Sequence, residues 1–175
     1  MKKSLICVLA VVVVLCCAIG GTVAWLMDRT DPVTNTFTVG DINIELTETT
    51  GDTYKMVPGN ALAKDPKVTV LAGSEACWLF VKVEASANFS SFMTYEMADG
   101  WTALAGHPGV YYREVPAASV NTSFNIIKNN TVLVKDTVTK EMLNADDFEE
   151  PTLTFTAYAV QKDNVTTAVS AWEKL

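Results

Sequence analysis

The sequence predicts an all-β protein, a two-sheet β-sandwich of jelly-roll-like type with a short C-terminal helix. Three observations support this fold class. Short runs rich in Val, Ile, Thr, Phe and Tyr recur along the 175-residue chain, and several of them alternate apolar with polar residues. Turns containing Gly or Pro separate these runs. Helical spacing of apolar residues is confined to two short segments, and many short strands with little helix indicate packed sheets.

The alternation of apolar and polar residues, together with the turn residues, predicts where the individual strands lie. Cys77–Ala85 is the clearest core strand, because Cys77, Leu79, Val81 and Val83 are apolar and share one face. Turns are expected at Pro58-Gly59, at Ala72–Ser74 and at Gly106–Gly109. The other strands that we expect in this part of the chain are Lys67–Leu71, Phe92–Met97, Val110–Val115, Ser123–Lys128, Thr131–Val138 and Thr152–Gln161.

The first predicted strand contains a break in its alternation, and two short helices are expected near the C-terminus. Thr36–Glu48 alternates strongly, but its apolar parity changes between Val39 and Ile42, so a β-bulge or tight corner is expected at Gly40-Asp41. Asn164 is a suitable N-cap for a terminal helix with apolar residues at helical spacing. A short helical turn is expected at Thr139–Ala145.

The first 24 residues have the pattern of a cleaved secretory signal. Two lysines precede an apolar run from Leu5 to Ile19, which has 15 residues, whereas a membrane-spanning helix needs about 20. Thr22 and Ala24 supply the small residues that a signal peptidase requires before a cut between Ala24 and Trp25. A retained N-terminal anchor is the alternative. We therefore expect an exported chain that starts at Trp25 and keeps no membrane span.

Cleavage at this point would define the composition of the secreted chain. Loss of Lys2 and Lys3 takes the formal net charge from −7 to −9, and Cys77 is the one cysteine left. A nucleic-acid ligand is not expected for so acidic a chain, and neither is an internal disulfide. The expected organisation is a leader at 1–24, an N-terminal segment at 25–38 and one β-sandwich domain at 39–175. No C-terminal anchor or sorting motif is visible.

The region around the predicted cut resembles the TasA/camelysin family. Gly21–Asp28, a short polar spacer and then Asn35–Leu46 are similar to the start of these secreted proteins of Gram-positive bacteria. One departure is Leu26, where the family usually has Phe or Tyr. The resemblance implies processing by a SipW-type signal peptidase. It also implies one of two functions, since one branch forms extracellular fibres of the biofilm matrix and another is named for a surface metallopeptidase activity.

The residues favour a protein without a catalytic site or cofactor. A zinc peptidase needs three protein ligands, usually rich in histidine, and His107 is the one histidine of the chain. Its position before Pro108 indicates an exposed turn residue. Cys77 is expected to be a buried, inert thiol. The weak candidates for a metal site, here calcium, are the carboxylates Asp146, Asp147, Glu149 and Glu150.

The mature N-terminus is the best candidate for an interaction site. Trp25, Leu26 and Met27 would form an exposed apolar end, and Phe37 lies in the first alternating strand. Such a segment can add as a strand to a neighbouring subunit, which is the part that it plays in the resembled fibre proteins. The expected partners are further copies of this chain or related matrix subunits. The alternative is a monomeric adhesin, whose glycan platform would use Trp101, Tyr111 and Tyr112.

Overall fold

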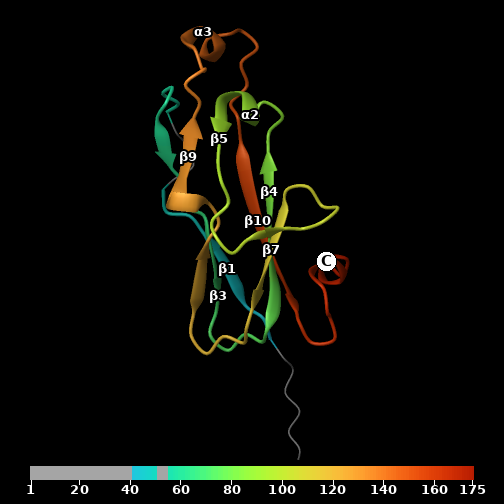
Figure 1. Ribbon diagram of the computed structural model, residues 1–175. Helices are drawn as coiled ribbons and strands as arrows, with labels where there is room; N and C mark the ends of the chain where they lie inside the picture. The colour runs from blue at the N-terminus through green and yellow to red at the C-terminus, as the bar shows by residue number, and fades with distance from the viewer. Residues whose placement is uncertain (1–40, 51–54) are drawn as a thin grey trace, which may run out of the picture. The chain divides into compact units, whose positions relative to one another are not determined.

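The computed structural model describes residues 41–50 and 55–175, and it confirms the all-β prediction. Ten strands of the described chain form three antiparallel sheets, and its helices are short (Figure 1). All described residues belong to one compact unit. None of their helices is long and apolar enough to cross a membrane.

The largest sheet has the strand order β10-β4-β7-β6. Its strands are β4 (Cys77–Ala85), β6 (Thr102–Ala103), β7 (Val110–Val115) and β10 (Leu153–Gln161). The predicted bounds of β4 and β7 are confirmed, and β10 begins one residue later than predicted. β4 lies between two partners and is almost wholly buried, whereas β10 is at the edge and no residue of it is fully buried.

The two smaller sheets replace the single second sheet of the prediction. One is β1-β3-β8, with β1 at Ile44–Thr47, β3 at Lys67–Val70 and β8 at Thr122–Asn125. The other is β2-β9-β5, with β2 at Ala61–Ala63, β9 at Thr131–Val134 and β5 at Met93–Thr94. The sequence did not indicate β2 or β6, and Phe92–Met97 is mostly not strand.

The division into two sheets has a local cause at Pro66. Two stretches of chain pair twice, first as β2 with β9 and then as β3 with β8. Between the two ladders, Lys67 follows Ala63 by four positions on one stretch, whereas Thr131 follows Asn125 by six positions on the other. Proline cannot donate to a ladder, and the 3₁₀ turn η1 (Lys128–Asn130) takes up the extra residues. The sequence predicted a single second sheet, and this interruption divides it into two.

The main core lies between the four-stranded sheet and the two smaller sheets. The face of β4 that carries Leu79 and Val81 packs here, as predicted, against Val68, Val70 and Val134. The opposite face of β4 is also covered. Its buried residues Trp78 and Phe80 form a second cluster with α4 (Ala168–Trp172) and the loop before it.

The helices differ in detail from the prediction. The N-cap of α4 is Thr167, whose side chain accepts a hydrogen bond from the main chain of Ser170, and not Asn164, which has a positive φ of 61° in the preceding turn. Helix α3 (Lys140–Leu143) lies within the predicted segment and is capped by Thr139. The one-turn helix α2 (Phe89–Phe92) was not predicted.

Candidate functional site

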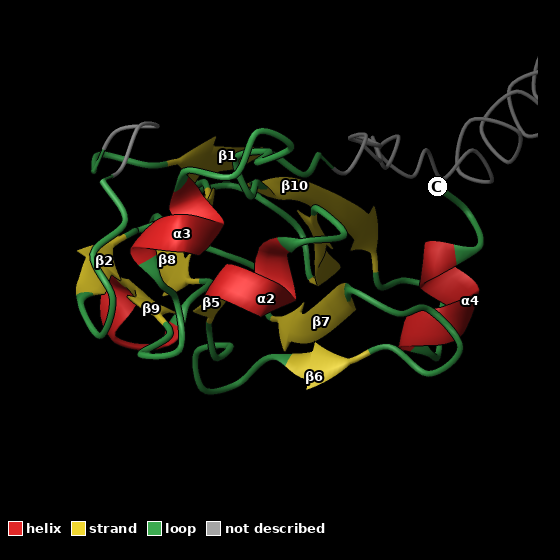
Figure 2. Cartoon of the chain, turned by 90° about the horizontal axis from the view of Figure 1, so that it is seen from above, coloured by secondary structure: helices red, strands yellow, loops and turns green. Residues whose placement is uncertain are grey.

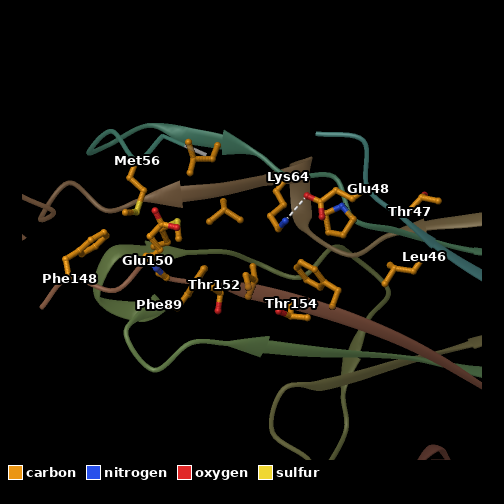
Figure 3. Close-up of a pocket in the computed structure, with 17 residues that line it drawn as sticks. Leu46, Thr47, Glu48, Met56, Lys64, Phe89, Phe148, Glu150, Thr152 and Thr154 are labelled. Carbon is orange, nitrogen blue, oxygen red and sulfur yellow. Dashed lines mark hydrogen bonds and ion pairs between the residues drawn. The ribbon is translucent and has the colours of Figure 1, made fainter. Parts of the chain in front are cut away.

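A groove opens along one side of the sandwich, between strands of different sheets. Its volume is about 530 Å³. The end of β1 and β2 line one wall, and the first residues of β10 line the other (Figure 3). In Figure 3, Met56, Phe89 and Phe148 lie toward one end of the groove and Leu46 and Thr47 toward the other. The sheet edges β1 and β10 run next to each other here (Figure 2).

Most of the groove wall is apolar, and a few charged groups lie on it. The apolar lining residues come from β1, β2, α2, β5, β9, β10 and the loops beside them, and they are Leu46, Met56, Leu62, Pro66, Phe89, Met93, Val132, Phe148, Pro151, Leu153 and Phe155. Lys64 Nζ lies 2.7 Å from a carboxylate oxygen of Glu48 and 5.8 Å from the centre of the Phe155 ring. Such walls favour an occupant with apolar side chains and a hydrogen-bonding backbone.

Asp65 fixes the loop beside the groove. Its carboxylate accepts hydrogen bonds from the main-chain nitrogens of Thr49, at 2.9 Å, and Thr50, at 3.0 Å. It also accepts bonds from both threonine hydroxyls. These donors, with Thr49 first, hold the pKa of Asp65 far below its ordinary value, because they stabilise the charged carboxylate. The loop that leaves β1 is therefore held against the segment that leads into β3.

The outer edge of β10 has no strand partner among the described residues. Ser86 N donates to Thr152 O at 3.0 Å, and Lys162 N donates to Ala76 O at 2.8 Å. These bonds continue the β4–β10 register at both ends, so even-numbered residues of β10 turn their main-chain groups toward β4. The odd-numbered residues from Leu153 to Gln161 therefore direct N–H and C=O groups away from the sheet.

The side chains of these odd-numbered residues face the core. Leu153, Phe155, Ala157 and Ala159 all pack against the main core, yet each stays partly exposed. Across the groove, Leu46 of β1 is 38% exposed. One more strand beside β10 would pair with its free main-chain groups and cover these apolar side chains in the same step.

The other candidates from the sequence do not form a site together. Among residues 41–50 and 55–175, no group of three or more His, Cys, Asp or Glu side chains is placed to hold a metal ion. Asp146, Asp147, Glu149 and Glu150 are exposed in the loop after α3. His107 is half-buried, and not fully exposed as expected, because its ring lies 6.0 Å from the Trp172 ring. Cys77 is buried, and burial raises the pKa of its thiol to about 11.

The suggested aromatic platform is not formed. Tyr111 packs against the main core and Tyr112 against the second cluster, so the two rings lie on opposite faces of β7. Trp101 covers Arg113, whose guanidinium carbon lies 3.8 Å from the centre of the Phe124 ring. The sequence pattern did not indicate this contact between a cation and the two rings.

The predicted assembly residues Trp25, Leu26, Met27 and Phe37 lie outside the described residues, as does the predicted cut after Ala24. The groove could not be predicted from the sequence, because its walls come from segments far apart in the chain. One signal was present in β10, whose core-facing positions include the small residues Ala157 and Ala159.

Comparisons of this chain with protein-family models, with curated proteins and with solved structures find no match.

Proposed function

We propose that this chain is a secreted structural protein of the extracellular or biofilm matrix. Its subunits assemble into fibres when the N-terminal segment Trp25–Thr38 of one molecule adds as a strand to the next. The molecule acts as a building block and carries no catalytic centre. The resemblance of the first quarter of the sequence to the TasA/camelysin family is in line with this proposal.

The unpaired outer edge of β10 is the observation that carries the proposal. A fibre former that works by strand addition needs an open sheet edge on every subunit, and a monomeric adhesin has no need of one. At nine residues β10 is one of the two longest strands described, and its odd-numbered residues offer main-chain donors and acceptors in a row. The proposed acceptor is this edge.

The groove beside that edge supports the same reading. A strand added to β10 would place every second side chain between β10 and the wall formed by β1 and β2. These side chains would cover apolar residues such as Leu46, Leu62 and Phe155, which are part-exposed in the isolated subunit. The edge then provides affinity through main-chain bonds, while the groove selects the register.

The energies involved are large enough for a stable contact. Each added main-chain hydrogen bond is worth roughly 0.5–1.5 kcal/mol. Burial of a large apolar side chain adds roughly 1.5–3 kcal/mol. Association costs about 4–15 kcal/mol of translational, rotational and ordering free energy. A segment that pairs along β10 and buries Trp25, Leu26 and Met27 can exceed this cost, and loss of the three apolar side chains would remove roughly 4.5–9 kcal/mol from the favourable side.

Because donor and acceptor are different surfaces, the contact is heterologous and repeats without closing. Each subunit that receives a segment still offers its own segment to another molecule. Such a contact produces an open filament, which suits a matrix protein.

Removal of the segment tests the proposal. Chains that begin at Trp25 and at Gly40 are purified, and their assembly is followed by light scattering and electron microscopy. The chain from Trp25 should form filaments, and the chain from Gly40 should stay monomeric and folded, with the same β-sheet circular dichroism. A full mature chain in which Trp25 and Leu26 are both changed to Asp should also stay monomeric. If the chain from Gly40 forms the same filaments, or if the chain from Trp25 remains monomeric at high concentration, the proposal is wrong.

A further inference from the structure

We infer that the groove between β1, β2 and β10 is a binding site for an organic cation, namely an aliphatic chain that ends in an ammonium group. Glu150 and Phe148 would hold the ammonium group, and the apolar floor of the groove would cover the chain. The inference goes beyond the proposed function, because this site lies within one molecule and consists of described residues.

The first step is the shape of the groove. Its volume of about 530 Å³ lies within the range of roughly 300–1,000 Å³ that small-molecule sites have. Phe89, Met93 and Val132 line it and are buried, so they form a floor that belongs to the main core. Leu62 and Phe155 on the walls are partly exposed. The groove is therefore a hollow and not a flat apolar patch, and it can cover a narrow chain on several sides.

The second step is the charge of the groove. Its charged lining residues are Glu48, Lys64 and Glu150. Lys64 and Glu48 form an ion pair at 2.7 Å, so their charges offset each other. The carboxylate of Glu150 has no ion-pair partner among the described residues, which leaves the groove with one net negative charge. The formal net charge of the chain is −7, so the local and the long-range fields both favour a cation over an anion.

The third step is the position of Glu150. Its side chain lies toward the end of the groove that also holds Met56, Phe89 and Phe148 (Figure 3). The Phe148 ring packs edge to face on Phe92, with 5.5 Å between the ring centres, so its position is fixed. Aromatic faces attract ammonium groups, and a carboxylate beside them adds to that attraction. This end of the groove is therefore the place for the ammonium group.

Hydrogen bonds hold the segment around Glu150 in place before any ligand binds. Asn88 Nδ2 donates to Glu149 O at 2.7 Å. Thr152 N donates to Ser86 Oγ at 2.9 Å. Glu150 thus lies between two anchored positions. Because the binding groups are already ordered, little conformational freedom is lost when a ligand binds.

The aliphatic chain would extend from this end of the groove toward β1. Leu62 of β2 lines one side of that path, and Leu153 and Phe155 of β10 line the other. Apolar contact has no fixed direction, so chains of different length can use the same path. Each further methylene that is buried should tighten binding by about threefold to fourfold.

A fatty-acid anion is the competing occupant. Its carboxylate would have to approach Lys64, which is already paired with Glu48. The carboxylate of Glu150 would repel it at the other end of the groove. The charge of the ligand therefore separates the two possibilities, and probes that share one chain and differ in charge can test it.

Decyltrimethylammonium and decanoate are such probes. Both are titrated calorimetrically, at low ionic strength, into the mature chain in which Trp25 and Leu26 are changed to Asp. This variant is expected to stay monomeric, so no neighbouring subunit competes for the groove, and the result has the same meaning whether or not unsubstituted chains form fibres. We expect decyltrimethylammonium to bind at least about tenfold more tightly than decanoate.

Substitutions in the same chain test the place of the ammonium group. Glu150→Gln should reduce the ratio of the two affinities at least about threefold, since it removes the unpaired charge of the lining. Glu149→Gln is the matched control, because it removes the same charge one residue away from the lining, and it should change the ratio by less than about 1.5-fold. Phe148→Leu keeps the wall apolar, so it should weaken decyltrimethylammonium about threefold and leave decanoate unchanged.

Two leucines test the path of the chain. Leu62→Ala should weaken both probes at least about threefold, because it removes apolar surface from the wall. Leu133→Ala is the control, since Leu133 is exposed on β9 and does not line the groove, and it should leave both affinities unchanged. Circular dichroism of each variant verifies that it is folded.

Each outcome supports or overturns the inference. A preference for the cation that depends on Glu150, together with an effect of Leu62→Ala, supports it. Tighter binding of decanoate would assign the groove to an anionic ligand and overturn it. An equal effect of Glu150→Gln and Glu149→Gln would show that the charge of the whole molecule causes the preference, and would overturn the site. So would the absence of binding by either probe. None of these results depends on the filament test of the proposed function.

Discussion

At the scale of single residues, one carboxylate organises the wall of the groove. Asp65 accepts four hydrogen bonds from Thr49 and Thr50, so the loop after β1 depends on its charge. The depressed pKa of this carboxylate means that protonation opposes folding. The stabilisation is complete above the ordinary pKa of 3.8, and it is lost as the pH falls below that value toward the folded-state pKa.

We expect the Asp65→Asn variant to be less stable than the parent protein at pH 7 and to lose less stability on acidification. Urea denaturation at pH 7, 4 and 3 measures this, because the difference between the two proteins should narrow as the pH falls below about 4. Asp146→Asn, in the exposed loop after α3, is the matched control and should follow the parent. A constant difference between Asp65→Asn and the parent across this range would contradict the prediction.

Arg113 is a cation that is packed among aromatic side chains. It lies between the Phe124 and Trp101 rings, and its buried Nε has no hydrogen-bond partner among the described residues. Burial lowers the pKa of the guanidinium, in keeping with an environment that disfavours the charge. Its contribution therefore comes from the packed stem and the planar head on the rings.

For this reason Arg113→Met should retain the stability of the parent, whereas Arg113→Ala should lower the free energy of unfolding by about 1–2 kcal/mol. Urea titrations followed by tryptophan fluorescence measure the free energy of unfolding of both variants. The ratio of the two losses is the quantity that tests the prediction. Equal destabilisation by Met and by Ala would show that the charge matters more than the packing.

At the scale of elements, β4 is the strand on which the fold is organised. One face packs against the two smaller sheets, and the other holds α4 through Phe80, whose ring lies 5.3 Å from that of Trp172. Trp78 Nε1 donates to Val165 O at 3.0 Å in the same buried cluster. The second face thus fixes the C-terminal helix.

Phe80→Ala should lower the free energy of unfolding by about 3–5 kcal/mol, because it empties a fully buried position in the second cluster. Lys82→Ala, two residues along on the same face, is the control and should change it by less than about 0.5 kcal/mol, since its ion pair with Glu84 is exposed. Chemical denaturation measures both. A small effect of Phe80→Ala would mean that α4 is not held by this contact.

The elements also show what the sequence could predict. β4 and β7 were placed residue for residue, because their apolar residues lie in long runs with strong strand preference. β2 and β6 have only three and two residues, which is too few for an alternating apolar pattern to be recognised. The capping prediction at Asn164 is wrong because Thr167 caps the shorter helix. The groove depends on the pairing of distant segments, which no local pattern encodes.

At the scale of the whole molecule, the export that we propose would change the composition of the chain. Removal of the predicted leader would leave a chain with a net charge of −9 and one cysteine, Cys77. Without a disulfide, such a chain depends on its core for stability. The processed end would then be available for assembly.

We expect secreted protein to begin at Trp25, because Thr22 and Ala24 give the small residues required before the cut. Intact-mass analysis of protein from the culture medium measures the mature N-terminus. Recovery of chains starting at Met1 from the membrane fraction would contradict this and favour a retained anchor.

The purified mature protein should not hydrolyse casein, with or without added zinc. His107 is the one histidine of the chain and packs on Trp172, and a zinc peptidase needs further ligands beside it. Turnover that is abolished by a chelator and absent from His107→Ala would restore the peptidase alternative.

The position of β10 in the chain also determines when the molecule can fold. Between 68 and 84 positions separate the paired residues of β4 and β10, and α4, the last element, covers the other face of β4. A central strand whose partner comes so late cannot be completed while the chain is still being delivered, and distant pairing of this kind slows folding. We therefore expect the chain to stay unfolded until its final residues are free, and such a delay would suit the export that we propose. A chain ending at Pro151 should show no cooperative unfolding transition, and one that unfolds cooperatively would disprove this order of events.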